Sequence, residues 1–195
     1  MKYSETIKLI EEKVKEGKAK QEIFTEVRNE IKIPHEKLAD LLKKTPTLAQ
    51  RKKYKLSNTL LIIFLLISIF IELLNAWFVV NRGIKFIDSI QVFLFPIAYL
   101  FFVVKVINFR ANTYKHIVVF AVLDILIFLL NLSSINFSDS FSIALMLNYS
   151  LLLISIYLGI ILDKRLNSTY TRKFEKYTTK DGQEKTRILY IMDEE

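Results

Sequence analysis

The sequence of 195 residues contains no cysteine, two histidines, four glycines and three prolines. Without cysteine the chain has no disulfide and no thiolate ligand, and imidazole is available only from His35 and His116. The sequence has no glycine-rich phosphate-binding loop, no nucleophile placed beside a base and no metal-ligand spacing. We therefore expect a protein without enzymatic activity and without a cofactor or metal.

Charge is missing from most of the middle of the chain. Apolar residues dominate four segments there, which are residues 57–80, 86–107, 114–135 and 141–162. Because an α-helix rises 1.5 Å per residue, about 20 apolar residues cross the roughly 30 Å hydrocarbon core of a bilayer. The third segment is the weakest candidate for a membrane span, since Asp124 lies at the centre of its apolar part. The second contains Pro96, which membrane helices tolerate when neighbouring helices satisfy the freed carbonyl group.

The four apolar segments could instead be buried helices of a water-soluble protein. Four such helices in about 106 residues would leave no amphipathic surface to face water. The sequence therefore predicts an all-α integral membrane protein, in which residues 51–163 form a bundle of four transmembrane helices. Residues 1–50 form a polar unit before this domain, and residues 164–195 form a tail after it.

Lysine and arginine are distributed unevenly around these segments. A basic belt, which suits contact with anionic lipid headgroups, precedes the first segment and consists of Arg51, Lys52, Lys53 and Lys55. The loop between the second and third segments is also basic, whereas the loop at residues 133–140 has no lysine or arginine. Arg82 and Lys85, in the loop between the first and second segments, oppose this distribution, but they are fewer than the basic residues on the other side. The positive-inside rule therefore predicts that both termini are cytoplasmic.

The composition and the start of the chain indicate which membrane to expect. A sequence rich in lysine, isoleucine and asparagine is typical of proteins from AT-rich bacterial genomes. About 55 polar residues precede the first apolar segment, so we expect that segment to act as an uncleaved signal anchor. We take the bacterial inner membrane as the expected location.

Residues 1–50 show the periodicity of three short amphipathic helices. Apolar residues recur at helical spacing in 3–15, 20–32 and 35–44, with Gly17 and Pro34 at the breaks. So small a core is only marginally stable by itself, and we expect it to pack against the membrane domain, a second copy or a partner.

Two stretches of this unit, GKAKQEIF at 17–24 and IPHEKLADLL at 33–42, resemble the second and third helices of helix-turn-helix DNA-binding units. That resemblance implies a nucleic-acid partner. Residues 1–50 nevertheless carry 11 basic and 9 acidic groups, whereas a DNA-binding domain needs basic residues clustered on one face. The charge pattern favours a protein-interaction or structural unit over one that binds nucleic acid.

The tail contains two β-prone runs, residues 171–179 and 184–192, on either side of Asp181-Gly182. This pattern indicates a β-hairpin, which would need the N-terminal helices, a neighbouring subunit or a partner to pack against. A partly disordered tail is the alternative.

Each apolar segment carries its polar residues along one face. The predicted intramembrane polar cluster is Ser68, Glu72, Asn75, Gln91, Asp124, Asn131 and Asn148. A carboxylate in hydrocarbon costs roughly 2.5 to 3.5 kcal/mol, so Glu72 and Asp124 should face the interior of the bundle. They could serve as interhelical hydrogen-bonding groups, in which a protonated carboxyl bonds to Asn or Gln of a neighbour. The alternative is that they form a proton or ion relay or a substrate pocket.

We favour the first role and predict a non-enzymatic, multi-pass membrane protein that acts through protein–protein interaction. It would be a regulatory, accessory or toxin-immunity type component, in contact with the lipid bilayer and with copies of itself or another protein. The alternative is an oligomeric ion channel or small transporter with a polar path through the helices.

Overall fold

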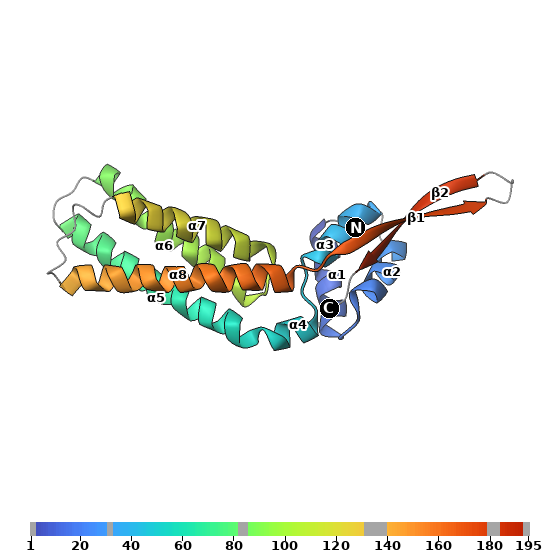
Figure 1. Cartoon of the computed structure of the whole chain (residues 1–195), viewed down its shortest axis with the longest axis horizontal. Coiled ribbons are helices and arrows are strands. Elements are labelled where there is room, and N and C mark those ends of the chain that lie inside the picture. Colours follow the sequence, from blue (N-terminus) through green and yellow to red (C-terminus); the bar gives the residue numbers. More distant parts are fainter. Residues whose placement is uncertain (1–2, 31–32, 82–85, 131–139, 179–183, 193–195) are drawn as a thin grey trace. The chain divides into compact units, whose positions relative to one another are not determined.

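The computed structural model describes residues 3–30, 33–81, 86–130, 140–178 and 184–192 (Figure 1). The chain is mostly helical and carries one small two-stranded sheet. It divides into two compact units, which are described separately. The first consists of Met1–Lys53 with Arg165–Glu195, and the second consists of Tyr54–Lys164.

The first unit begins with four helices, α1 (Tyr3–Lys15), α2 (Lys20–Glu30), α3 (His35–Lys43) and α4 (Leu48–Lys53). The first three cover the segments with helical periodicity, while α4 was not predicted. Gly17 ends α1 with φ of +83°, a left-handed conformation that glycine adopts without steric cost.

A hairpin completes the first unit. Strand β1 (Tyr170–Thr178) pairs antiparallel with β2 (Glu184–Met192), in a register that runs from Tyr170 opposite Met192 to Thr178 opposite Glu184. The strands lie where the sequence predicts a hairpin, and the predicted turn at Asp181-Gly182 lies outside the described residues.

Helices and hairpin share one hydrophobic core. The side chains of Tyr190 and Met192 are buried against apolar residues of α1, α2 and α3. Those helix residues are Ile10, Val14, Ile23, Phe24, Val27, Leu38, Ala39 and Leu42. The rings of Phe24 and Tyr190 lie 6.0 Å apart, in a tilted contact between α2 and β2. The hairpin therefore supplies part of the core that three short helices lack by themselves.

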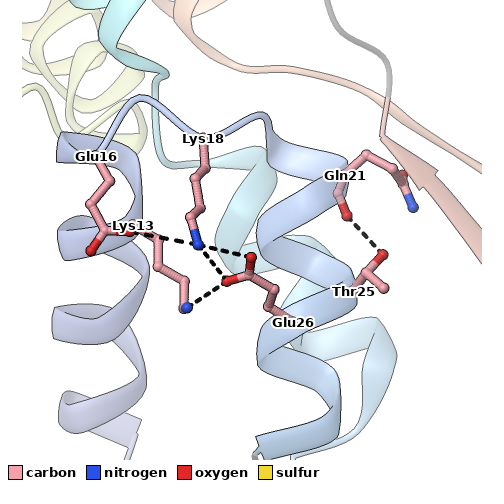
Figure 2. Close-up of polar contacts among 6 residues, drawn as sticks. All are labelled: Lys13, Glu16, Lys18, Gln21, Thr25 and Glu26. Atoms are coloured by element: carbon pink, nitrogen blue, oxygen red, sulfur yellow. Dashed lines mark hydrogen bonds and ion pairs between the residues drawn. The ribbon is translucent and has the colours of Figure 1, made fainter.

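An ion-pair cluster joins α1 to α2 at the surface (Figure 2). The Nζ atoms of Lys13 and Lys18 lie 2.5 and 2.8 Å from the carboxylate oxygens of Glu26. Hydrogen bonds from Lys13 and Lys18 hold the pKa of Glu26 below its ordinary value. The contribution of this cluster is present at neutral pH and is lost as the pH falls through that lowered pKa. It is small, because water screens exposed pairs.

The second unit consists of long apolar helices, α5 (Lys55–Asn81), α6 (Phe86–Ile107), α7 (Asn112–Leu130) and α8 (Ser140–Leu166). Three stretches are long and apolar enough to cross a bilayer, namely Lys55–Trp77, Asn112–Leu130 and Ile143–Leu166. In α6 the fully described apolar part, Phe93–Ile107, is shorter than a span requires. The fold is thus that of a mostly helical membrane protein with three candidate spans among its described residues.

Large apolar side chains cover the outer faces of these helices. Phe70, Trp77, Ile97 and Tyr157 are among those more than 60% exposed within the chain. So extensive an apolar surface would be unfavourable in water, and lipid tails would cover it without penalty.

The helices approach one another closely at one glycine. A Cβ atom added to Gly159 of α8 would lie 2.9 Å from Cγ2 of Val118 on α7. The absence of a side chain here allows two backbones to pack together, as small residues do in membrane helices.

Candidate functional site

The candidate site is a set of buried polar contacts among α5, α6, α7 and α8. Asn148 on α8 donates a hydrogen bond from Nδ2 to Oε1 of Glu72 on α5, with 2.7 Å between the two atoms. Both side chains are buried, and Asn75, almost one turn after Glu72, also hydrogen-bonds to the carboxyl group. This contact links the first and last of the apolar helices.

A second contact joins α6 to α7. The hydroxyl group of Tyr99 donates to Oδ2 of Asp124 over 2.8 Å, and both residues are buried. Beside it, the rings of Phe128 on α7 and Tyr149 on α8 stack with centroids 3.8 Å apart. A carboxyl oxygen of Asp124 therefore accepts a hydrogen bond from a neighbouring helix.

A third contact, which the sequence did not predict, lies near the start of α5. Tyr114 on α7 donates its hydroxyl proton to Oδ1 of Asn58 over 2.7 Å. The amide of Asn58 in turn donates to the backbone carbonyl of Val106 on α6 over 3.0 Å. One buried asparagine thus connects three helices.

Apolar side chains separate the third contact from the other two. Asn58 and Glu72 are 14 residues apart on α5, which corresponds to about 21 Å along the helix. The buried side chains of Leu61 and Leu65 lie between them on α5, and Ile117 occupies a similar level on α7. The third contact therefore lies at a separate level of the helices, and the buried side chain of Ser68 also lies between Asn58 and Glu72 on α5.

Three buried polar atoms have no hydrogen-bond partner in the part of the chain that the structure describes. They are Oγ of Ser68, Oδ1 of Asn148 and Oγ of Ser155. Ser68 precedes Glu72 by about one helical turn on α5, and Ser155 follows Asn148 by about two turns on α8. These atoms could accept or donate further hydrogen bonds to water, an ion or a polar group of another helix.

The structure brings together only some of the seven residues of the predicted intramembrane polar cluster. The structure brings Glu72 together with Asn75 and Asn148, and it buries Ser68 on the same helix as Glu72. Asp124 meets Tyr99, where the sequence suggested an asparagine or glutamine. Asn131 and the side chain of Gln91 lie outside the described residues.

The basic belt lies at the junction of α4 and α5. Arg51, Lys52 and Lys53 form the last turn of α4, and Lys55 is the first residue of α5. The Nε atom of Arg51 donates to the carbonyl of Pro46, and the three lysines are exposed. The exposed ammonium groups of Lys52 and Lys55 are accessible to phosphate groups of a headgroup layer.

The first unit contains an open groove of about 580 Å³. It is bounded by the end of α2, the start of α3 and one edge of β2, and its lining includes Arg28, Pro34, His35, Ile188 and Tyr190. A volume of this size lies within the range of small-molecule and peptide pockets.

Neither site resembles a metal centre, because the described ranges contain no group of three or more His, Cys, Asp or Glu side chains placed to hold an ion. No known protein family, curated protein or solved structure matches the chain.

Proposed function

We propose that this chain is a non-enzymatic, multi-pass membrane protein that acts through protein–protein interaction, as a regulatory, accessory or toxin-immunity type component. The observation that carries the proposal is that each of the two buried carboxyl groups is hydrogen-bonded to a side chain of a neighbouring helix. Asn148 on α8 donates to Glu72 on α5, and Tyr99 on α6 donates to Asp124 on α7. Such contacts hold the helices of a membrane protein together.

The surface of the first unit supports the same proposal. An open groove borders β2, and the hairpin exposes Phe174 and Ile188, which oppose one another across the two strands. Exposed apolar side chains next to a groove are typical of surfaces that bind other proteins.

An oligomeric ion channel or small transporter is the second candidate, and one observation favours it. Ser68 Oγ, Asn148 Oδ1 and Ser155 Oγ are buried without a partner among the described residues. Buried polar atoms are usually satisfied, so these could face an ion or water in a multi-subunit assembly.

Two measurements on the wild-type protein separate the candidates. In liposomes under a pH or salt gradient, we expect no flux above that of empty vesicles. With a photo-crosslinking amino acid at Phe174, we expect a discrete adduct with another protein in native membranes, and none with the same label at exposed Lys8. Flux above background would favour the channel, and a Phe174 adduct absent at Lys8 would favour the interaction protein.

The proposal includes a specific topology in the bacterial inner membrane. We infer that α6 is a fourth span, because its 22 residues rise about 33 Å, enough to cross the hydrocarbon core. The basic belt at Arg51, Lys52, Lys53 and Lys55 then lies at the cytoplasmic headgroups, and both termini are cytoplasmic.

Reporter fusions test this topology. Fusions after Gln50, within Asn108–Asn112 and at Glu195 should report the cytoplasm, and one at Ser138 should report the opposite side. The expectation follows from four spans and from the lysine-free and arginine-free loop at 133–140. A C-terminal fusion that reports the periplasm would mean an odd number of spans.

A further inference from the structure

The outer edge of β2 is unpaired where it borders the groove. The sheet has only two strands among the described residues, so each strand keeps one free edge. The backbone N–H of Met192 donates to Oε1 of Gln21 on α2 over 2.8 Å and therefore faces away from β1. Because backbone groups alternate direction along an antiparallel strand, the N–H and C=O groups of Ile188 and Tyr190 face the same outer edge.

Helix α2 follows this edge and leaves a gap beside it. Gln21 contacts Met192 near one end, and Arg28, two helical turns later, lines the groove together with Ile188. Two turns of helix and four residues of strand cover about 11 and 13 Å, so both elements advance by similar lengths. Gln21 thus closes the edge at Met192, while the groove leaves it open at Ile188.

The charges of the groove favour an acidic occupant. Its guanidinium groups belong to Arg28 and Arg187, and its carboxylate belongs to Glu36. Glu36 pairs with Arg172, and Arg187 pairs with Glu175 at 2.6 Å. Arg28 has no acidic partner among the residues that the structure describes, so it remains available to a carboxylate.

We propose that this groove binds an extended, acidic peptide segment of a partner protein, which adds as a third strand along the outer edge of β2. Main-chain hydrogen bonds to Ile188 supply affinity, and a carboxylate of the peptide pairs with Arg28. Strand addition to an exposed sheet edge is a common mode of peptide recognition, in which backbone bonds bind and side-chain pockets select. The proposal rests on the proposed interaction function and names its partner surface.

The test uses the full-length protein in nanodiscs and fluorescent nonapeptides, read by anisotropy up to about 1 mM peptide. The first peptide alternates Glu with Val and Thr, the second replaces each Glu by Lys, and the third keeps Glu but places Pro at two alternate positions. We expect saturable binding of the first peptide and no binding of the other two. Proline removes backbone donors, and lysine reverses the charge that Arg28 would meet.

Two protein variants locate the binding site. Arg28→Glu should weaken binding at least about tenfold, because it replaces an attractive pair by a repulsive one, and Lys8→Glu on exposed α1 is its charge-matched control. Ile188→Pro removes an outward N–H and leaves the bonds to β1 intact, so it should also weaken binding about tenfold. Thr186→Pro, at the next outward position and outside the groove lining, is its control. Unchanged circular dichroism confirms that each variant is folded.

Several outcomes would overturn the proposal. They are equal binding of the glutamate and lysine peptides, binding that survives both Arg28→Glu and Ile188→Pro, or no binding by the wild type. Concentration-dependent self-association that Ile188→Pro abolishes, without peptide binding, would assign this edge to a second copy instead. If the groove fails while the Phe174 adduct forms, the interaction function stands and its surface lies elsewhere.

Discussion

Leu38→Asp should unfold the first unit while the apolar helices remain in the membrane. Leu38 is 1% exposed and packs in the core that α1, α2 and α3 share with Tyr190 and Met192. An unpaired carboxylate there costs well over the roughly 3 to 5 kcal/mol that so small a core supplies. Phe24→Asp should have the same effect, since Phe24 contacts both His35 and Tyr190.

The measurement is limited proteolysis of the protein in nanodiscs, combined with circular dichroism. In Leu38→Asp, sites within α1, α2, α3 and both strands should be cut together, because the hairpin shares their core. Lys37→Asp is the control, since it places the same new carboxylate at an exposed position of the same helix. Equal protease resistance in Leu38→Asp and wild type would mean that these residues are not buried together.

The helices of the first unit could be predicted because their apolar residues follow the helical period. Ile10 and Val14 are four residues apart, as are Ile23 and Val27, and all four are buried in the structure. Helix α4 was missed because its sequence, LAQRKK, has no apolar stripe. At its start, the backbone N–H of Thr47 donates to Oε1 of Gln50, and the backbone N–H of Gln50 donates to Oγ1 of Thr47. This reciprocal pair of hydrogen bonds stabilises the first turn of α4.

The partner of the hairpin could not be predicted in the same way. Alternation in EKTRILYIM places Tyr190 and Met192 on one face of a strand, but it does not say which surface covers that face. The contact with α2 and α3 joins residues more than 140 positions apart, and such pairings depend on three-dimensional shape.

The polar contacts were predicted in part. The cost of a carboxylate in an apolar interior places Glu72 and Asp124 inward, and both are buried. Tyr99 was missed because a tyrosine in an apolar run reads as an aromatic side chain, although its hydroxyl needs a partner when buried. Asn58 was missed because it lies three residues after the start of α5, where polar residues are expected to face headgroups.

The two carboxyl groups decide between interhelical bonding and conduction. If they only hold helices together, Glu72→Gln and Asp124→Asn should leave thermal stability within about 1 kcal/mol of wild type, because an amide oxygen still accepts the bonds from Asn148 and Tyr99. Glu72→Leu and Asp124→Leu should each cost about 1 to 3 kcal/mol, since they leave a buried donor without an acceptor. Ser150→Leu, at an exposed position of α8, should cost little and serves as the control.

A double-mutant cycle makes the assignment specific to one bond. Tyr99→Phe combined with Asp124→Leu removes donor and acceptor together, so it should be less destabilising than the sum of the two single changes. Unfolding in detergent gives all three free energies. Additive losses would mean that the bond between Tyr99 and Asp124 contributes nothing to the packing of α6 on α7.

Conduction predicts the opposite dependence on the amide variants. A relay needs a group that gains and loses a proton, so Glu72→Gln or Asp124→Asn would abolish flux in liposomes while the protein stays folded. We expect instead that wild type and both amide variants show no flux above that of empty liposomes under a pH gradient. Wild-type flux that disappears in Glu72→Gln would show that Glu72 belongs to a conducting path, because bonding between helices does not require a titratable group.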